Sequence, residues 1–321
     1  MSTVSDIRPP RIWPVDRLTA LFFLISATIT AAYFGRVERA PLFLAMNAVV
    51  LATLGLLVYA TPRLSDRAAA LWRLLHGCIA TPLVFTQTGF LVKGVRGDEF
   101  ASTLERADRL LFLGTNPLEA IEGISSPVLT EVMQWAYTSY LLLPPAVVIL
   151  LALKASPYQT GRSCFALVGV MYLSYFGYFL VPASGPNLHN NLGPLKSVID
   201  AYPYPLLPHL YTFNSDLPGV WLTSEMRSWM FDVETTKQDC FPSGHTAVAV
   251  TGWILARRLG RSYGRWFAFF AVGITLSTVY LRYHYVVDVI VGVGLAWFAA
   301  GPFLKLHDRW YGDGAAAPAA R

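Results

Sequence analysis

Two short stretches of the sequence combine a histidine with residues that bind or orient an anion. The first is CFPSGHTAVAV, residues 240–250, in which His245 stands where a polar loop becomes an apolar segment. Ser243 is a favourable N-cap residue, Gly244 permits close backbone approach, and the free N–H groups of a first helical turn attract anions. This stretch therefore predicts a phosphate site at a helix N-terminus, with His245 beside it.

The second stretch is YLRYHYVVDVIVG, residues 280–292. His284 and Asp288 are four residues apart and share one face of a helix, so the carboxylate can fix the imidazole ring. If both stretches lie on one side of a membrane, a reacting phosphate would sit between His245 and His284. These are the groups that phosphoryl transfer through a phosphohistidine requires.

The elements that must position these residues are apolar. The chain has 321 residues, of which 54% are hydrophobic and 14% charged, and its apolar runs are about long enough to cross a bilayer. This predicts an all-α, polytopic membrane helix bundle with about eight spans, the fourth kinked by Pro144 and Pro145. The expected spans are residues 18–35, 40–60, 77–92, 132–153, 164–182, 244–259, 265–281 and 284–304.

The distribution of charge predicts the orientation of the chain. With the N-terminus inside, the inner segments carry 15 Lys and Arg against 5 Asp and Glu, whereas the outer segments carry 10 against 15, as the positive-inside rule requires. The sixth and eighth spans then both begin outside, so His245 and His284 lie at the same depth. We expect a cell-membrane protein whose active site faces the periplasm or cell exterior, or the lumen in a eukaryote.

The distribution of charge also indicates which partners to expect. The net charge of +5 comes from basic residues at the ends of spans and not from one patch, so no nucleic-acid partner is expected. The expected partners are the bilayer and a lipid phosphate or phospholipid substrate. The oligomeric state stays open.

Three parts of the chain are expected. Residues 1–76 form an N-terminal tail and a two-span hairpin, residues 77–305 form a six-span catalytic core, and residues 306–321 form a cytoplasmic tail. The core includes a long outer loop, residues 183–243, which is long enough to form a lid or a binding surface.

The core also includes a predicted amphipathic helix, residues 95–113. Its apolar residues would lie on one side, and the helix would rest on the outer membrane surface. These apolar residues are Phe100, Leu104, Leu110 and Leu111.

Together the two histidine stretches resemble the type 2 phosphatidic acid phosphatase superfamily, whose second motif is PSGH and whose third motif places His-x-x-x-Asp at the start of the last span. The resemblance implies that His284 is the nucleophile on phosphorus, that Asp288 orients it, and that His245 protonates the leaving oxygen. Ser243 and Gly244 are implied to hold phosphate oxygens. The implied fold is a six-helix membrane core.

The sequence departs from this superfamily in its basic residues. The resemblance covers about residues 77–304, but Thr278 replaces an arginine of the third motif, and the basic first motif is missing. Arg282 and Lys237 are the nearest cations and the expected phosphate ligands, although Arg282 could instead anchor the helix end at the headgroups. Without these basic motifs, the chain resembles more closely the branch that holds the inositol phosphorylceramide synthases of the aureobasidin-resistance type and the sphingomyelin synthases. The stretch DRLLFLGTNP, residues 108–117, is also similar to that branch.

Several functions stay open at this point. A phosphohistidine enzyme could pass its group to water, as a lipid phosphatase, or to an alcohol, as an inositolphosphotransferase-like enzyme. The alternatives are a polyprenyl diphosphate phosphatase of envelope synthesis and a non-catalytic transporter or lipid-binding scaffold.

Neither a cofactor nor a metal is expected. His245, His284 and Asp288 could bind zinc, but the anion-binding PSGH turn favours a metal-free site. The three cysteines, including Cys240, are scattered and indicate neither a disulfide framework nor a CxxC site. We interpret Cys240 as a small packing residue.

Overall fold

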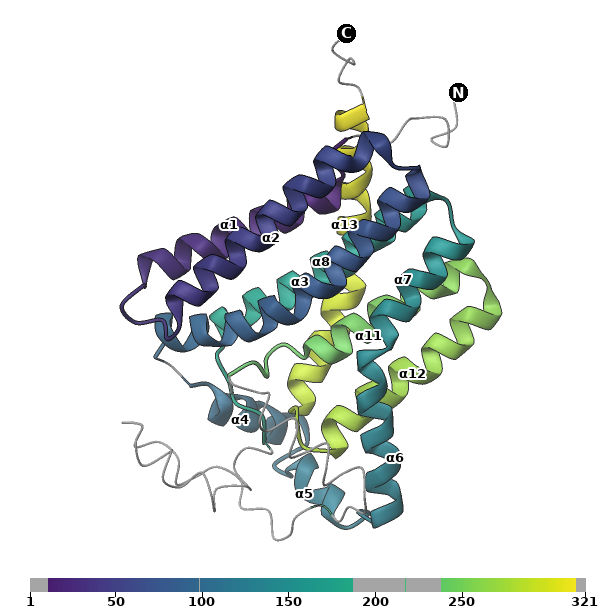
Figure 1. Ribbon diagram of the computed structural model, residues 1–321. Helices are drawn as coiled ribbons and strands as arrows, with labels where there is room; N and C mark the ends of the chain where they lie inside the picture. The colour runs from purple at the N-terminus through teal and green to yellow at the C-terminus, as the bar shows by residue number, and fades with distance from the viewer. Residues whose placement is uncertain (1–10, 98, 187–216, 218–237, 316–321) are drawn as a thin grey trace.

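A computed structural model of the protein describes residues 11–97, 99–186, 217 and 238–315, and it is built from α-helices (Figure 1). In chain order the helices are α1 (Pro14–Ala32), α2 (Ala40–Ala60), α3 (Asp66–Val95), α4 (Ala101–Leu111), α5 (Pro117–Glu122), α6 (Pro127–Thr138), α7 (Leu143–Lys154), α8 (Pro157–Leu180), α11 (Gly244–Ala256), α12 (Arg261–Tyr280) and α13 (Val286–Ala315). The described residues contain no β-strand, only an isolated bridge between Ala183 and Asp239. The predicted all-α fold is confirmed.

Local sequence explains where several helices begin and where one is broken. Ser65, Ser156 and Ser243 are N-cap residues whose side-chain oxygens accept hydrogen bonds from N–H groups of the first turn, groups that otherwise lack partners at a helix start. The helices α6 and α7 are bent by 48° at the break between them. Pro144 and Pro145 follow this break directly, which confirms the predicted kink because proline cannot continue the hydrogen-bond ladder.

Four helices are long and apolar enough to cross a membrane, namely α1, α2 with the turn after it, α8 and α13. The bent pair of α6 and α7 passes the same test jointly and makes a fifth candidate. The three other predicted spans fall on α3, α11 and α12, which are helical without passing that test among the described residues. A count of eight spans and a six-span core therefore remain predictions.

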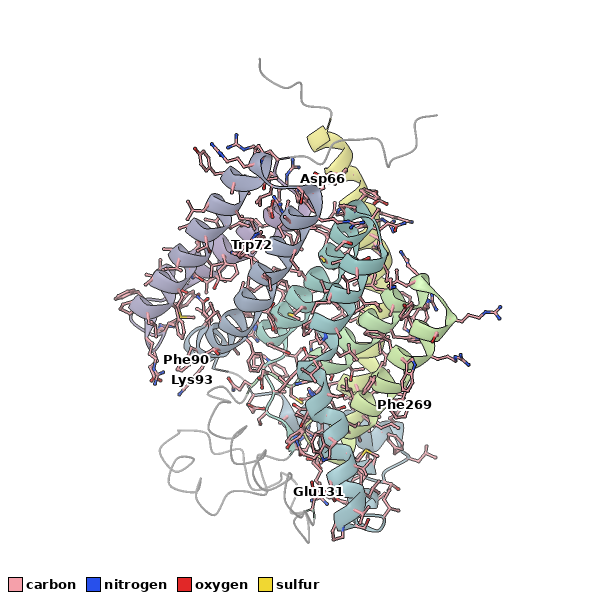
Figure 2. The ribbon with its side chains drawn as sticks, turned by 45° about the vertical axis from the view of Figure 1, so that its right-hand side comes forward. Asp66, Trp72, Phe90, Lys93, Glu131 and Phe269 are labelled. Carbon is pink, nitrogen blue, oxygen red and sulfur yellow. The ribbon has the colours of Figure 1, made fainter. Side chains whose placement is uncertain are left out.

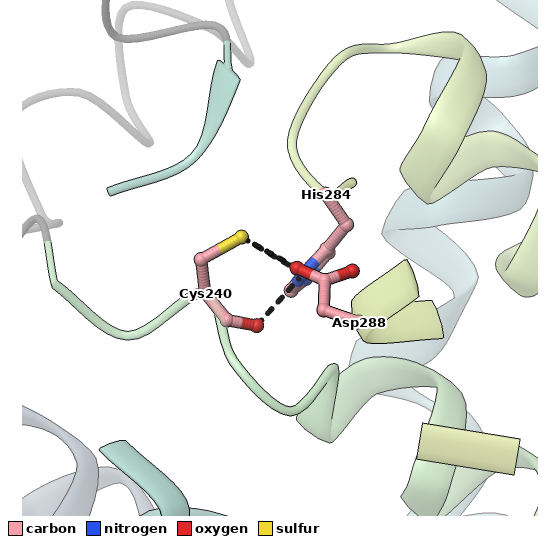
Figure 3. Close-up of side chains that lie close together, drawn as sticks. All are labelled: Cys240, His284 and Asp288. Carbon is pink, nitrogen blue, oxygen red and sulfur yellow. Dashed lines mark hydrogen bonds and ion pairs between the residues drawn. The ribbon is translucent and has the colours of Figure 1, made fainter. Parts of the chain in front are cut away.

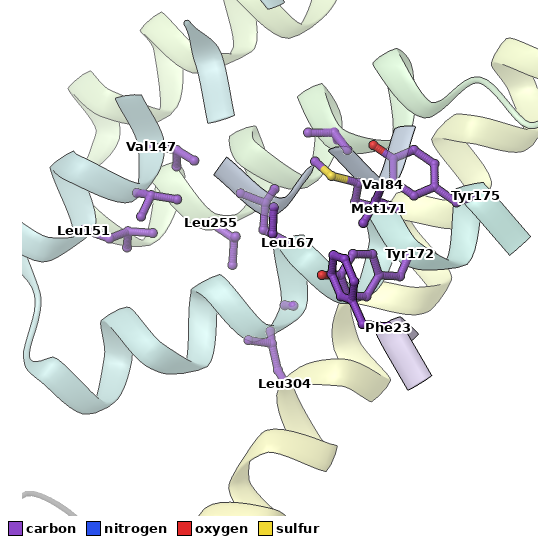
Figure 4. Close-up of a cluster of buried hydrophobic side chains, with 14 of the residues drawn as sticks. Phe23, Val84, Val147, Leu151, Leu167, Met171, Tyr172, Tyr175, Leu255 and Leu304 are labelled. Atoms are coloured by element: carbon purple, nitrogen blue, oxygen red, sulfur yellow. The ribbon is translucent and has the colours of Figure 1, made fainter. Parts of the chain in front are cut away.

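The helix α8 occupies the centre of the bundle, and Figure 4 shows the core around it. Its residues Leu167, Met171 and Tyr172 pack together with Phe23 of α1 and Leu255 of α11. The helix α11 lies between α8, α12 and α13 and is buried along almost its whole length. A helix with no exposed face holds its N-terminus in a fixed place, and that N-terminus carries His245.

Large apolar side chains cover the outside of the bundle. Trp72 of α3 and Phe269 of α12, both labelled in Figure 2, are more than half exposed, and Leu153 and Phe298 are more exposed still. A soluble monomer rarely exposes apolar surface on this scale, whereas lipid tails cover it without cost. The exposed apolar residues and the long apolar helices together identify a membrane protein.

A buried ion pair fastens the first helix to the bundle. Asp16 of α1 accepts hydrogen bonds from the guanidinium of Arg73 in α3, with the shortest at 2.8 Å. Trp13 packs against Phe165 of α8 beside the end of α13. The helix α3 runs through residue 76, so the division between a hairpin and a core at that residue stays a prediction.

Candidate active site

Three helix ends meet around two histidines. His245 lies in the first turn of α11, His284 in the turn between α12 and α13, and Asp288 in the first turn of α13. Nδ1 of His245 is 3.3 Å from Nε2 of His284, and Nδ1 of His284 is 3.2 Å from Oδ2 of Asp288. The structure thus brings together the residues that the two sequence stretches contain.

The N-terminus of α11 is shaped by the serine and the glycine of PSGH. The side-chain oxygen of Ser243 accepts a hydrogen bond from the backbone N–H of Thr246 at 3.3 Å and donates one to Oγ1 of Thr246 at 3.0 Å. A Cβ on Gly244 would lie 2.7 Å from the hydroxyl oxygen of Tyr178 in α8. Packing against α8 therefore requires this glycine, a reason that the sequence did not reveal.

The turn before α13 fixes the backbone of His284. The carbonyl oxygen of Thr278 accepts hydrogen bonds from the backbone N–H groups of Tyr283 at 3.0 Å and His284 at 3.1 Å. Arg282 has a φ of 62°, a left-handed conformation that costs a non-glycine residue about 1–2 kcal/mol. Such strain persists only where the surrounding structure enforces it, and it clusters at functional sites.

The start of α13 also contacts the PSGH turn directly. The backbone N–H of Ser243 donates to the carbonyl oxygen of Asp288 at 3.2 Å. Gly292, one turn later, faces the same serine, and a Cβ on it would lie 2.6 Å from the carbonyl oxygen of Ser243. The absence of a side chain at Gly292 lets α13 approach closely enough to align the two histidines.

Two acceptors fix the tautomer of His284, as Figure 3 shows. Its Nδ1 lies 3.1 Å from the carbonyl oxygen of Cys240 and 3.2 Å from the carboxylate of Asp288. A carbonyl oxygen can only accept, so Nδ1 carries the proton and Nε2 keeps its lone pair. His284 therefore presents a nucleophilic nitrogen to the side where His245 lies.

The side chain of Cys240 also belongs to this arrangement. Its thiol donates to Oδ2 of Asp288 at 2.7 Å. Burial, followed by the charge of Asp288, raises the pKa of the Cys240 thiol well above its ordinary value, which keeps the proton on the sulfur. The interpretation of Cys240 as a packing residue was incomplete, because its backbone and its side chain both contact the groups that orient His284.

A tyrosine that sequence analysis missed orients the other histidine. The hydroxyl of Tyr137 in α6 lies 3.0 Å from Nε2 of His245, and the ring of Tyr140 packs on the same imidazole with centroids 4.4 Å apart. When Tyr137 donates to Nε2, the ring proton of His245 sits on Nδ1 and points at His284. The result is one directed chain of hydrogen bonds from Tyr137 through both histidines to Asp288.

The expected position of the phosphate needs a correction. A nucleophile stands about 3–3.5 Å from the atom that it attacks, yet the two facing nitrogens of His245 and His284 are themselves only 3.3 Å apart. A phosphorus atom does not fit between them in this arrangement, because the two rings hydrogen-bond to each other. One ring must move aside before a phosphoryl group can contact both.

An acidic residue from a distant helix caps the start of α13. The carboxylate of Asp108 in α4 accepts hydrogen bonds from the backbone N–H groups of Val286 at 2.8 Å and Val287 at 2.7 Å. These N–H groups lie between His284 and Asp288 in the chain. Burial raises the pKa of Asp108 to about 6, and its two backbone hydrogen bonds oppose that rise.

The helix α4 packs differently from the prediction. It begins at Ala101 and not at residue 95, and its polar and apolar residues lie on different sides as predicted. Of the predicted apolar residues, however, Leu104 is buried whereas Leu110 and Leu111 are exposed. Its buried face includes Asp108. An amphipathic sequence pattern predicts that carboxylates face water. Here the carboxylate of Asp108 is buried because it accepts hydrogen bonds from two backbone N–H groups.

A second carboxylate holds the loops that lead to the site. Glu99 accepts hydrogen bonds from the backbone N–H of Ser184 at 2.9 Å and from the side chain of Gln238 at 3.0 Å. Next to these contacts, the backbone N–H of Cys240 donates to the carbonyl oxygen of Ala183 at 3.0 Å. Burial raises the pKa of the Glu99 carboxyl. The hydrogen bonds of Glu99 fix the two loop segments that hold Cys240 against His284.

Of the two cations that were expected to bind phosphate, Arg282 lies in the described part of the chain and Lys237 does not. Arg282 is 1% exposed, so it does not reach outward to lipid headgroups, and it lies two residues before His284. Lys237 lies outside the described residues, as does most of the loop 183–243. A role for either cation in binding phosphate stays a prediction.

Comparison with known protein families gives one match. The sequence profile of the PAP2 superfamily matches residues 102–301, which extend from the start of α4 to the middle of α13 and include every residue of the hydrogen-bond chain. No curated protein and no solved structure matches the chain.

Proposed function

We propose, since this chain belongs to the PAP2 superfamily, that it is an integral membrane enzyme which removes or transfers a phosphoryl group or a phosphorylated headgroup of a lipid through a phosphohistidine. Membership of the superfamily supports a lipid phosphatase-type activity. The intermediate, the metal independence and the identity of the acceptor are the finer parts of the proposal.

The observation that carries the proposal is the directed chain of hydrogen bonds from Tyr137 to Asp288. It leaves Nε2 of His284 unprotonated and places a proton on Nδ1 of His245, and these two nitrogens face each other. A purely structural pair of histidines does not need a protonated nitrogen to face an unprotonated one. Phosphoryl transfer does, because it needs an acid and a nucleophile side by side.

In the first half-reaction, Nε2 of His284 attacks phosphorus and the bond from phosphorus to the lipid oxygen breaks. When the phosphate anion is bound, His245 carries protons on both nitrogens, and the departing oxygen takes the one on Nδ1, which leaves a neutral imidazole. The ring of His284 becomes positively charged, and Asp288 stabilises that charge through Nδ1. Tyr137 contacts Nε2 of His245 in both states of that ring, as a donor to the neutral ring and as an acceptor from the charged one.

In the second half-reaction, His245 removes a proton from water or from an alcohol, and the resulting oxygen attacks the phosphohistidine. The bond between phosphorus and Nε2 breaks, and both histidines return to their first protonation states. Water yields a phosphatase, and an alcohol yields a transferase.

Binding the phosphate requires donors and positive charge. We propose that the N–H groups at the start of α11, including that of Gly244, contact its oxygens together with Ser243. Arg282 is the nearest proposed cation, with Lys237 as a second one. The missing basic motifs favour the branch of inositol phosphorylceramide and sphingomyelin synthases, with the site on the outer face of the membrane.

The test is an assay of the purified protein in detergent with a chelator present. Phosphate-labelled phosphatidic acid, an inositol or choline phospholipid, and a polyprenyl diphosphate are each offered with and without a ceramide or diacylglycerol acceptor. Free phosphate identifies a phosphatase, a labelled new lipid identifies a transferase, and preference for the diphosphate identifies the envelope-lipid enzyme.

Protein denatured under alkaline conditions during turnover should carry alkali-stable label that acid releases, and His284→Ala should carry none. His245→Asn should accept label more slowly and release it more slowly, because it lacks the acid and the base. Turnover in His284→Ala at the unmutated rate would refute the phosphohistidine, and absence of turnover with every lipid would favour a non-catalytic scaffold.

A further inference from the structure

One of the two histidines forms, with two neighbouring side chains, a cluster of metal-ligand types that the proposed reaction uses only in part. Cys240, His284 and Asp288 offer a sulfur, a ring nitrogen and a carboxylate oxygen, all within 4.8 Å of one another (Figure 3). All three side chains are buried. This set differs from the set of His245, His284 and Asp288 that the sequence suggested, because its nitrogen is Nδ1 of His284 and its third ligand is a thiol.

Two of the three distances between these ligand atoms match those of a tetrahedral zinc site. Ordinary zinc–ligand bonds and tetrahedral angles require about 3.5 Å between sulfur and nitrogen and about 3.3 Å between nitrogen and oxygen. The observed distances are 3.5 Å from Sγ of Cys240 to Nδ1 of His284 and 3.2 Å from that nitrogen to Oδ2 of Asp288. The third distance, from sulfur to oxygen, is 2.7 Å and has to increase by about 0.8 Å to reach about 3.5 Å.

The chemistry of the donors favours zinc or cadmium over magnesium or calcium. A thiolate and an imidazole are ligands of softer ions, whereas magnesium and calcium take oxygen. With Cys240 and Asp288 ionised and His284 neutral, the ligands carry the two negative charges that balance a divalent ion. A water molecule or a phosphate oxygen would complete four-coordination.

We propose that Cys240, His284 and Asp288 form an inhibitory site for zinc and similar thiophilic ions, which rests on the proposed role of His284 as the nucleophile. On binding, the thiol proton leaves to solvent, the proton on Nδ1 of His284 moves to Nε2, and the ion bonds to the thiolate, to the carboxylate and to the freed Nδ1. A neutral imidazole that gives its Nδ1 lone pair to a metal carries its proton on Nε2. The nitrogen that would attack phosphorus then has no lone pair, so the ion stops the reaction without occupying the phosphate position.

The experiment uses full-length protein in which Cys78 and Cys164 are replaced by serine, so that Cys240 is the only cysteine. It is purified in detergent, stripped with chelator and titrated with chelator-buffered free zinc during turnover of the best lipid substrate. Cys240→Ser is compared in the same background, since serine keeps the backbone carbonyl and a hydroxyl donor while removing the thiolate. Each variant is normalised to its own metal-free rate, and a variant with Cys240 and Cys164 both present serves as the matched control.

A second readout does not depend on activity. Cadmium bound to a thiolate gives a charge-transfer absorption in the ultraviolet, and this band should appear at one equivalent in the protein that retains Cys240. It should be absent in Cys240→Ser and weakened in Asp288→Asn, which loses a carboxylate ligand.

We expect zinc to inhibit reversibly, and Cys240→Ser to raise the half-inhibiting zinc concentration at least about tenfold, as loss of a ligand contact does for metal affinity. Equal inhibition of both proteins, or no inhibition at about a hundredfold excess of zinc over protein, would overturn the inhibitory site and leave the proposed function intact. Loss of activity with chelator and its return with zinc would overturn both. If no lipid is turned over, the cadmium band alone still decides whether the site exists.

Discussion

Replacing Asp108 by asparagine separates the positioning of the active site from the stability of the fold. The carboxylate of Asp108 bonds two N–H groups at the start of α13, whereas an amide has one acceptor and would turn its NH₂ group toward the second N–H. One buried donor then loses its partner, which costs about 1–3 kcal/mol. The first turn of α13, which carries Asp288 and follows His284, is free to shift.

The same substitution removes the cost of burying a charge. The pKa of Asp108 rises from 3.8 to about 6, which corresponds to about 3 kcal/mol in favour of the neutral form. Because the folded pKa lies above the unfolded one, this group stabilises the fold most below about pH 4, and its contribution is lost as the pH rises through about 6. The two effects nearly cancel at neutral pH, so the Tm of Asp108→Asn at pH 7.5 should stay close to that of the unmutated protein.

Activity should not stay the same. A displacement of about 1 Å at a reacting group can cost about 100-fold in rate, so we expect kcat to fall by about 10- to 100-fold with a much smaller change in KM. Glu105→Gln is the matched control, since Glu105 lies one turn earlier on α4 and bonds Arg109 instead of α13. The assay is lipid turnover and thermal unfolding from pH 4 to 8 on the same preparations.

Two results would refute this reasoning. If Asp108→Asn keeps its kcat, the cap does not position the nucleophile. If kcat and Tm fall together, and the Tm difference from the unmutated protein does not change between pH 4 and pH 7, Asp108 is only a structural residue and burial does not shift its pKa.

Other substitutions test other contacts of the site. Tyr137→Phe removes the donor to Nε2 of His245 and should lower kcat about tenfold with little change in substrate affinity, measured by steady-state kinetics; an unchanged kcat would remove Tyr137 from the proton chain. Gly292→Ala forces a Cβ to within 2.6 Å of the backbone oxygen of the α11 N-cap residue and should abolish most activity, whereas Gly301→Ala, which meets nothing within 4 Å, should be harmless; equal activities would show that α13 can shift freely. Arg282→Gly suits a φ of 62° without strain, so the expected rise in KM for a phosphorylated lipid would report the lost guanidinium alone, and an unchanged KM would exclude it from the phosphate site.

Local rules predicted the parts of the site that are local in sequence. His284 and Asp288 are in contact as their four-residue spacing predicts, although His284 lies in the turn before α13 and not on the helix itself. Ser243 caps the helix that it begins, as an N-cap serine does. The kink at Pro144 likewise follows from the missing N–H of proline. None of these inferences needs to know which helices touch.

The contacts that depend on packing could not be predicted in this way. Tyr137 and Asp108 reach their partners across 108 and 178 residues. Nothing in the neighbouring sequence marks Tyr137, and only the stretch DRLLFLGTNP marks Asp108. The role of Asp108 was missed because an amphipathic pattern does not reveal that the buried start of another helix needs an acceptor. The space expected between His245 and His284 is missing for a similar reason, since spacing along the chain does not determine how two rings meet.

The two helix N-termini at the site differ in the charge of the group that caps them. From this difference we infer where a phosphate would bind. The first N–H groups of α13 are occupied by the carboxylate of Asp108, which leaves that end of the helix neutralised and closed to a second anion. At α11, Ser243 caps with a neutral hydroxyl and satisfies the N–H of Thr246, so the positive end of the helix keeps its charge. We therefore expect a phosphate to bind at α11, on the side of His245, and to approach His284 from there. Moving the carboxylate to the other end, as in Ser243→Asp, should repel the substrate and raise KM even where the cap and the fold are preserved.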